Sequence, residues 1–577
     1  MNRPTGASTR NSPLDLMKKE RSMIRSAATR MVTLSAALAL AWPISALAHP
    51  DAHSHAGAHG ASAHAKAAVP LYQNLGDHHY AITTRNAPAQ RYFDQGLRLY
   101  YAFNHQEAIR AFEEAARLDP ACAMCPWGVA LALGPNINAS MDEKAAGAAY
   151  QAIRRAVGLS AHASASEQAL IRALAARYAE FPRQNRTSLD LAYAQAMREV
   201  VRRHPQDLEA RTLYAEALMD LSPWNYWTRD GNPREYTREL LAQLEYVMKA
   251  NPNHPGANHF YIHAVEAVRP ELAIAAAERL VGLMPGAGHI VHMPGHIYVR
   301  VGRYADAIKA NEHAIHADES YIRDQNPAVG MYVLGYYPHN YDFLAFAASM
   351  IGRQEQAISA AEKIATLVAP ELLREPGMLF AQHHLTRHLQ MKVRFERWNE
   401  ILGSKIPDSD LKHARAMWHY ATGRAHAAKG ALAAAESELA RLRAIRDDKS
   451  LVSQRLEFNT SGQILSIAAE VLASHVAQAK GDFNAAVWHL RKAAQLEDKL
   501  VYGEPPEWSV PVRQDLGRVL VKAGRHAEAE RVFKEDLKRF PKNTWSLEGL
   551  QQASNERTRP AKPAAMASSG GDGGRRP

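Results

Sequence analysis

The sequence predicts an all-α protein built as a solenoid of stacked helix pairs, and three observations support this fold class. Hydrophobic residues make up 47% of the 577 residues but aromatic residues only 8%, a balance that suits closely packed helices rich in small side chains. The alternation of Val, Ile and Thr that marks strands is nearly absent. Finally, a pattern of about 34 residues recurs along the chain, which is the signature of a repeat architecture.

The opening of the sequence has the features of a secretory signal peptide. Basic residues precede a short apolar run, and Ala46 and Ala48 then occupy the small-residue positions of a cleavage site. The run is too short to span a bilayer, and no later stretch is long and apolar enough to do so. We therefore expect residues 1–48 to be removed near Ala48, with Met23 as an alternative start. The mature protein is expected in the periplasm or outside the cell, with no integral membrane segment.

Both ends of the mature sequence are of low complexity. Segment 49–69 is rich in His, Ala and Gly, and segment 556–577 is rich in Ala, Gly and Pro, so neither can bury a core and both are predicted to be disordered. The histidines of the first segment either bind a transition metal loosely or are incidental to a solvated linker. They are His49, His53, His55, His59 and His64. The signal and the C-terminal tail carry most of the net charge of +10, so the nearly balanced body gives no electrostatic argument for binding nucleic acid.

Three stretches between these ends share one spacing of small and aromatic residues. The positions are Gly96, Ala108, Phe112 and Pro120; Gly295, Gly302, Ala307 and Ala314; and Gly517, Gly524, Ala529, Phe533 and Pro541. This spacing resembles the tetratricopeptide repeat, in which two helices form one unit. Weaker copies with uneven spacing lie between the three.

The resemblance implies a fold and a usual use for it. The fold is a right-handed α-solenoid of about nine to ten helix pairs over residues 70–555, interrupted by inserted loops. The first helix of each pair would line a concave groove, and such grooves usually bind a protein or peptide partner. One inserted loop, 222–236, carries Trp224, Tyr226 and Trp227, which either cover the groove or fill the space between helices.

Imidazoles and carboxylates occupy the groove-facing positions of four consecutive predicted repeats. The candidate residues are His259, His263 and Glu266; His289, His292, His296 and Arg300; His339 and Asp342; and His383 and His384. Residues four apart on a helix lie on the same face. We therefore expect His289, His292 and His296 to share one groove with the histidines of the other three repeats.

This groove chemistry leaves three interpretations open. Neutral imidazoles with a carboxylate are ordinary ligands for zinc or copper, and His259, His263, His289, His292 and His296 are the candidate metal ligands. The same histidines can hold an acidic peptide, more strongly as pH falls. They can also be structural, donating hydrogen bonds to loops.

The prediction from the sequence is an exported scaffold that binds a protein or peptide in a histidine-rich groove. Binding or handling of zinc or copper, with or without metalloenzyme activity, is the alternative. The sequence contains no H-E-x-x-H motif, no phosphate-binding loop and no nucleophile elbow, so nothing in it requires catalysis.

Cys122 and Cys125 are the only two cysteines of the sequence. Pro120 ends one predicted helix and Pro126 favours the first turn of the next, so the pair lies in a corner between helices. A disulfide is expected in an exported protein. A soft pair of thiolates that binds Cu(I) is the alternative.

Overall fold

The computed structural model describes residues 69–181, 185–327 and 330–558. Over these ranges the chain forms helices and isolated β-bridges but no β-strand, so the prediction of an all-α solenoid of helix pairs is confirmed. The predicted signal peptide, the histidines of the 49–64 stretch and nearly all of the C-terminal tail lie outside the described residues. Within these ranges no helix combines the length and apolar character that crossing a membrane requires.

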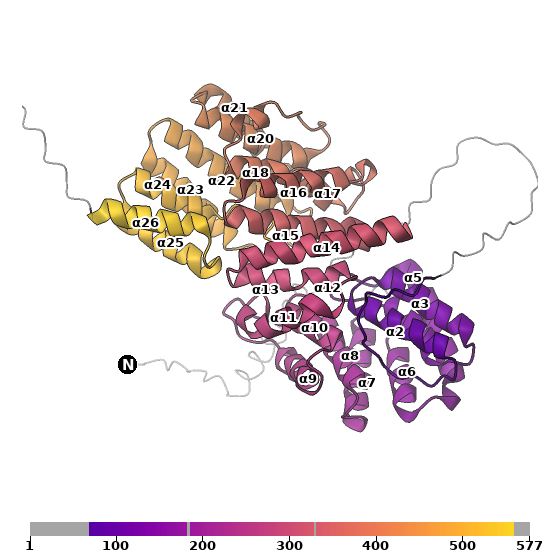
Figure 1. Cartoon of the computed structure of the whole chain (residues 1–577). Helices are drawn as coiled ribbons and strands as arrows, with labels where there is room; N and C mark the ends of the chain where they lie inside the picture. The colour runs from indigo at the N-terminus through magenta and orange to yellow at the C-terminus, as the bar shows by residue number, and fades with distance from the viewer. Residues whose placement is uncertain (1–68, 182–184, 328–329, 559–577) are drawn as a thin grey trace, which may run out of the picture.

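Consecutive helices pack as pairs along the chain (Figure 1). The first pairs are α2 (Ala87–Tyr101) with α3 (His105–Leu118), α4 (Met124–Ala132) with α5 (Glu143–Leu159), α6 (Ala165–Ala175) with α7 (Thr187–Arg203), α8 (Leu208–Asp220) with α9 (Thr237–Ala250), and α10 (Pro255–Val265) with α11 (Ile274–Leu283). They are followed by the broken helix α12 (Gly288–His292) and α13 (Pro294–Arg300) with α14 (Tyr304–Gln325), and by α15 (Tyr337–Met350) with α16 (Gln354–Leu367).

The C-terminal part continues the same arrangement. Its pairs are the broken helix α17 (Leu379–Leu385) and α18 (Arg387–Arg394) with α19 (Trp398–Leu402), α20 (Lys412–Ala428) with α21 (Leu432–Arg446), α22 (Ser461–Ala479) with α23 (Phe483–Glu497), and α24 (Val512–Lys522) with α25 (His526–Arg539), on which α26 (Thr544–Thr558) packs. Short segments η1 (Ser160–His162), η2 (Pro270–Ala273), η3 (Tyr332–Tyr336) and η4 (Pro370–Leu373) connect some of them.

The repeat pattern has a direct packing reason. A Cβ atom on Gly96 would lie 2.6 Å from the ring of Phe112, and a Cβ on Gly517 would lie 2.4 Å from the ring of Phe533. The small residue of the first helix therefore touches the aromatic residue of the second, and both rings are fully buried.

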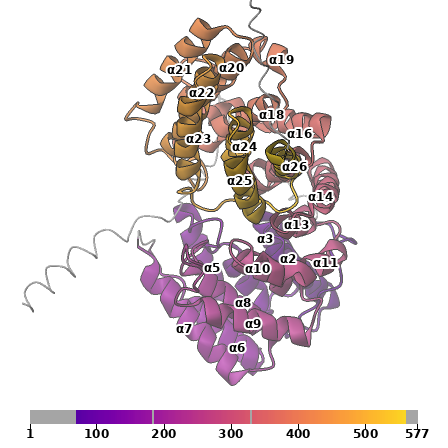
Figure 2. The same ribbon diagram turned by 90° about the vertical axis from the view of Figure 1, so that its left-hand side faces the viewer.

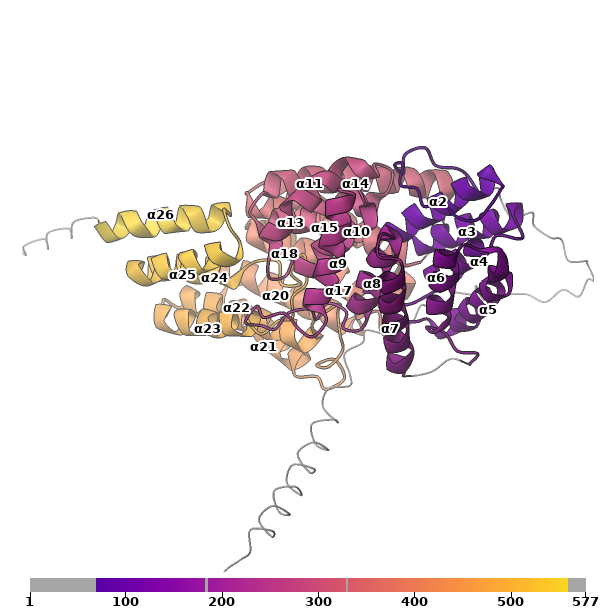
Figure 3. The same cartoon turned by 90° about the horizontal axis from the view of Figure 1, so that it is seen from below.

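The C-terminal pairs fold back against the middle of the solenoid (Figures 2 and 3). The Trp545 indole N–H donates to the Ser349 carbonyl at 2.8 Å, and the rings of Phe346 and Phe540 lie 6.1 Å apart. A Cβ on Gly302, in the turn before α14, would lie 2.4 Å from the Pro541 carbonyl oxygen. The first helices of the central repeats are consequently interior elements, and every residue of α10 is buried.

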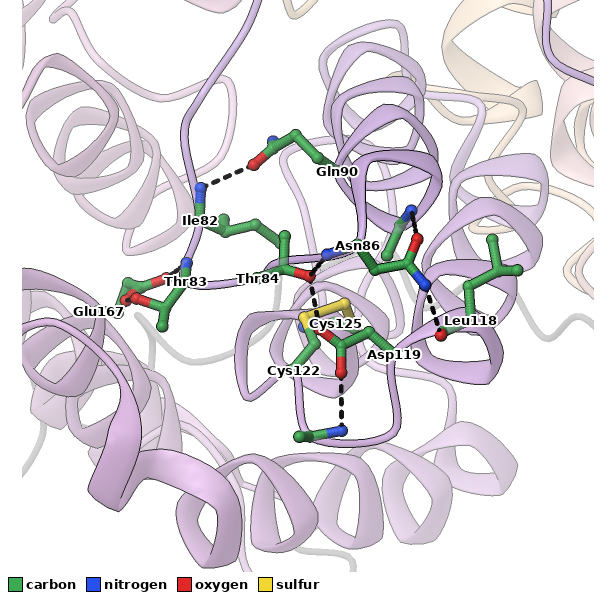
Figure 4. Close-up of a disulfide and its surroundings, with 12 residues drawn as sticks. Ile82, Thr83, Thr84, Asn86, Gln90, Leu118, Asp119, Cys122, Cys125 and Glu167 are labelled. Carbon is green, nitrogen blue, oxygen red and sulfur yellow. Dashed lines mark hydrogen bonds between the residues drawn. A yellow bond between two sulfur atoms is a disulfide. The ribbon is translucent and has the colours of Figure 1, made fainter.

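Cys122 and Cys125 form a disulfide at the start of α4 (Figure 4). Both residues are buried. Beside them, the Thr84 hydroxyl donates to the Asp119 carboxylate at 2.5 Å, which ties the segment preceding α2 to the corner between α3 and α4. The structure thus favours the disulfide interpretation over a pair of thiolates for soft metals.

Candidate functional site

Six histidines and one glutamate from three consecutive repeats meet inside the solenoid. They are His259 and His263 of α10, Glu266 at the end of α10, His289 and His292 of α12, His296 of α13 and His339 of α15. We call this set the histidine cluster. All are buried except His339, which is partly buried. The structure therefore gathers the candidate ligands of three of the four repeats into one place.

Local helix geometry explains this convergence. His259 and His263 are four residues apart on α10, and His292 and His296 are four residues apart across the break between α12 and α13, so each pair projects to one side. Pro294 begins α13, and because proline cannot donate a backbone hydrogen bond it interrupts the helix at that point.

The ring nitrogens of the cluster form two groups of three. His259, His263 and His289, which we call triad A, each offer a nitrogen, and these nitrogens lie within 4.8 Å of one another. The same holds for His292, His296 and His339, which we call triad B. No histidine belongs to both triads.

In triad B the hydrogen bonds determine where the protons are. The Asn311 side-chain amide donates from Nδ2 to the Ala307 carbonyl at 2.8 Å, so its Oδ1 faces His292 Nδ1, 2.8 Å away. His292 must therefore donate from Nδ1. His296 Nδ1 lies 2.5 Å from Oε2 of Glu266 and donates to that carboxylate.

With these proton positions, the Nε2 lone pairs of His292 and His296 face each other, and only an additional positive charge between them removes the repulsion. With Nδ1 protonated in both rings, each neutral imidazole presents a lone pair at Nε2. The Nε2 atoms of His292 and His296 nevertheless lie 2.8 Å apart in a buried site. Two facing lone pairs repel each other, so this pair requires either an additional proton or a metal ion.

In triad A, Nδ1 is fixed in His259 and His263, whereas Nδ1 of His289 has no hydrogen-bond partner. His259 donates from Nδ1 to the Tyr101 carbonyl at 2.7 Å, and its Nε2 lies 3.2 Å from Nε2 of His289. His263 turns Nδ1 toward Oε1 of Glu266 at 2.9 Å, and its buried Nε2 has no hydrogen-bond partner. Fixing one ring nitrogen while the other stays free is how proteins orient metal-binding histidines.

Burial keeps the cluster in the protonation state that binds metal. Burial and the neighbouring imidazoles lower the pKa of His259, His289 and His292 well below the usual range, and burial lowers the pKa of His339 to about 3. Burial works to raise the pKa of Glu266, but the facing imidazoles hold that pKa at about 2. At neutral pH His259, His289, His292 and His339 are thus in the neutral form that binds metal, and Glu266 is ionised.

Loops of the same chain cover the cluster, so it does not line the open groove expected from the sequence. The Tyr502 hydroxyl lies 3.3 Å from Glu266, and the Arg300 guanidinium lies 5.4 Å from the centre of the Tyr502 ring. On another side, the Trp224 ring packs edge-on against His263 with centroids 5.0 Å apart. Of the two roles considered for the insertion, Trp224 therefore covers the site. An external peptide cannot reach the imidazoles while Tyr502 and Trp224 are in place.

Asp342, the other candidate residue of the third repeat, does not join the cluster and pairs with the fourth repeat instead. Asp342 receives two hydrogen bonds of 2.6 Å from the buried guanidinium of Arg387, and this guanidinium also donates to the Glu507 carbonyl at 2.8 Å. Asp342 is therefore committed to an ion pair that anchors the segment covering the cluster.

His383 and His384 also lie outside the histidine cluster. His383 bonds with its two ring nitrogens to His413 at 3.1 Å and to the Glu507 carbonyl at 3.0 Å. His384 lies 3.3 Å from the Glu457 carboxylate. The expectation that all four repeats share one site is thus met only by the first three.

A second histidine–carboxylate group was not anticipated from the sequence, because one of its members precedes the first repeat. His78 and His254 lie 2.6 and 3.1 Å from Oε1 of Glu209, and the Tyr101 hydroxyl donates to Oε2. We call His78, Glu209 and His254 the N-terminal histidine group; it borders an open cavity of about 490 Å³. Tyr101 joins the two sites, since its carbonyl accepts the hydrogen bond from His259.

This second group is poorly suited to a metal. His254 caps α10 by accepting the Ala257 backbone N–H at Nδ1, 3.2 Å away, so its Nε2 carries the proton and donates to Glu209. Burial lowers the pKa of His78, but Glu209 outweighs it and raises that pKa above the usual value. The group is therefore an ion-paired network in which His254 has no nitrogen lone pair left for a metal ion.

Comparisons with known proteins give solved structures but no relatives. No family model and no curated protein matches the sequence. Similar solved structures include the APC/C hetero-tetramer Cut9–Hcn1 (12% identity, TM-score 0.30, covering 82% of this chain and 78% of that one). They also include the TPR domain of P58(IPK), with 11% identity and a TM-score of 0.20, covering 82% of this chain and 98% of that one. The human IFIT1 dimer with m7Gppp-AAAA has 11% identity and a TM-score of 0.30, covering 82% of this chain and 91% of that one. Likeness at this level carries no argument, and the all-helical solenoid fold rests on the helix pairs described above.

Proposed function

We propose that this chain is an exported metal-binding protein that holds a transition-metal ion in the histidine cluster. The observation that carries the proposal is the pair of facing Nε2 atoms in His292 and His296, 2.8 Å apart, with Nδ1 of each ring already committed as a donor. A metal ion bound by both lone pairs removes the repulsion without an additional buried proton.

The ligand set indicates the class of metal. Calcium and magnesium prefer oxygen ligands, whereas imidazole nitrogen suits zinc, copper, nickel and iron. The nearest carboxylate, Glu266, is used to orient His263 and His296. Zinc and copper are thus the ions that the cluster favours, the latter because it stands highest among divalent first-row metals in affinity for such sites.

Export is supported by two features of the chain. The first is the signal-like sequence of residues 1–48. The second is the disulfide between Cys122 and Cys125, because disulfides persist mainly in oxidising compartments.

A protein partner in the groove is the other use that a helical-repeat fold suggests. The burial of the imidazoles under Tyr502 and Trp224 argues against the histidines as its contacts. A partner would have to bind elsewhere on the solenoid.

The proposal is tested on the full chain with His49, His53, His55, His59 and His64 replaced by alanine, which removes loose binding by that stretch. We call this protein the leader-silent chain. After purification without chelators and titration with copper and with zinc, we expect at least one ion bound tightly, and its loss on combining His292→Ala with His296→Ala.

The matched control is His316→Gln, an exposed histidine on α14. It removes one imidazole without touching the cluster, so the ion should be retained. Equal binding by the leader-silent chain and the His292→Ala, His296→Ala protein would overturn the proposal.

A further inference from the structure

We propose that the histidine cluster is a two-ion centre, with one copper ion in triad A and one in triad B. This inference rests on the proposed function, since it concerns the number and identity of the ions at the same site. Three features carry it: the separation of the triads, their common construction and the charge of the ligand set.

Glu266 lies between the two triads, and its ligand atom also lies within 4.8 Å of those of His263 and His296, one member of each triad. One of its oxygens accepts from Nδ1 of His263 in triad A, and the other accepts from Nδ1 of His296 in triad B. In an imidazole ring, Nε2 points away from Nδ1, so both Nε2 atoms point away from the carboxylate and into different triads. Glu266 therefore orients one ligand of each ion, and a single ion cannot use the Nε2 atoms of all six rings.

The spacing within each triad suits an ion. Nitrogens about 2.0–2.1 Å from a tetrahedral ion lie roughly 3.3 Å from one another. The Nε2 atoms of His259 and His289 are 3.2 Å apart in triad A, and those of His292 and His296 are 2.8 Å apart in triad B. In each triad the third histidine lies within 4.8 Å of the other two, so rotation of its ring completes a three-nitrogen site.

Each triad also has its own aromatic wall. The ring of Phe103 lies 4.5, 6.1 and 5.3 Å from the rings of His259, His263 and His289. The ring of Phe343 lies 4.6, 4.5 and 5.0 Å from those of His292, His296 and His339. Phe103 precedes all histidines of the cluster in the sequence and Phe343 follows them all. In each triad, three imidazoles nevertheless pack against one phenylalanine.

The charge of the site selects copper over zinc. Glu266 is the single carboxylate hydrogen-bonded to the cluster among the residues that the structure describes. Burying a charge is costly unless it is compensated. Two Cu(I) ions bring two fewer positive charges into this buried site than two divalent ions would.

The experiment is an anaerobic Cu(I) titration of the leader-silent chain against a coloured Cu(I) chelator, with a parallel zinc titration. We expect two equivalents of Cu(I), bound at least tenfold more tightly than zinc. His289→Gln, which removes a ligand of triad A, and His339→Gln, which removes one of triad B, should each leave one equivalent. X-ray absorption at the copper edge should show about three nitrogen neighbours per ion and no sulfur.

Each of the other possible outcomes overturns a specific part of the proposal. One equivalent in the leader-silent chain that is lost in either variant overturns the two-ion centre but leaves the proposed function. Two zinc ions bound more tightly than Cu(I) overturn the choice of copper. No binding at all overturns the proposed function itself. Far-UV circular dichroism and thermal melting without metal show whether each variant is folded, and His316→Gln is again the control.

Discussion

The histidine cluster and the N-terminal histidine group are built from the same residue types, but their histidines have opposite hydrogen-bonding roles. In the cluster, His259 donates from Nδ1 to a backbone carbonyl, which leaves a lone pair at Nε2. In the N-terminal group, His254 accepts a backbone N–H at Nδ1, which places the proton at Nε2. One backbone contact thus decides whether a buried imidazole is a candidate ligand or a hydrogen-bond donor.

The two sites differ in charge for the same reason. Glu209 faces His78, whose pKa it raises against the effect of burial, so the pair is an ion pair. In the cluster, Glu266 serves two of six imidazoles, and burial depresses the pKa of the others. Proximity of histidines to a carboxylate is therefore insufficient to recognise a metal site; the hydrogen bonds at the opposite nitrogen must also be known.

The largest expected effect is the acid sensitivity of the metal-free protein. A histidine whose folded pKa lies below its unfolded value of about 6.5 contributes stability at neutral pH that is lost as pH falls from about 6.5 toward the folded pKa. Each such histidine of the cluster costs about 1.4 kcal/mol per pH unit in that window. We expect the urea midpoint of the metal-free leader-silent chain to fall steeply between pH 7 and pH 5.

The N-terminal histidine group contributes to stability with the opposite pH dependence. His78 has a raised pKa in the folded protein, so its pairing contributes stability that is fully present below pH 6.5 and is lost as pH rises through the folded value. As pH falls toward 6.5, His78→Gln should therefore remove a gain in stability that the parent chain shows, whereas His289→Gln should make the loss below pH 6.5 shallower. Equal pH slopes in the two variants would show that the two sites do not differ in protonation.

The next effect is stabilisation by metal. An ion present at about 1,000 times its dissociation constant stabilises the folded state by about 4 kcal/mol. We expect copper to raise the melting temperature of the leader-silent chain, and the combined His292→Ala and His296→Ala substitutions to reduce this rise. His254→Asn, which keeps a side chain able to cap α10, should leave it unchanged. Loss of the rise in His254→Asn would place a metal in the N-terminal group and break the comparison.

The sequence alone identified most histidines of the cluster, but it also grouped with them histidines that lie elsewhere in the structure. Helical spacing and the repeat resemblance placed His259, His263, His289, His292 and His296 on neighbouring first helices, where they do meet. The same reasoning grouped His383 with them, because it could not foresee the contacts of His383 with His413 and with the Glu507 carbonyl.

Other determinants come from parts of the chain with no local signal. Asn311 lies on α14, the second helix of its pair, where groove positions are not expected. Tyr502 reaches Glu266 across 236 residues, a contact that depends on the C-terminal pairs folding back on the middle. Single-repeat reasoning describes neighbouring units, whereas both of these contacts depend on how the units stack.

The smallest expected effect tests a residue that binds no ion. Asn311 is buried and fixes His292 through Nδ1, so Asn311→Leu frees that ring to rotate or to change tautomer. Loss of such an orienting partner typically lowers metal affinity 10- to 100-fold. We expect a loss of this size for one of the two ions, the one in triad B, and none for the ion in triad A, measured by the same Cu(I) competition.

His316→Gln on the same helix is the control, and it should change neither affinity. Gly295→Ala should act in the same direction but more weakly, since its Cβ would lie 2.8 Å from Nδ2 of Asn311 and push the amide aside. If Asn311→Leu weakened both ions equally, the triads would be coupled through Glu266 more strongly than their separate hydrogen bonds indicate. If it weakened neither, the proton assignment of His292 would be wrong, and with it the contrast between the cluster and the N-terminal histidine group.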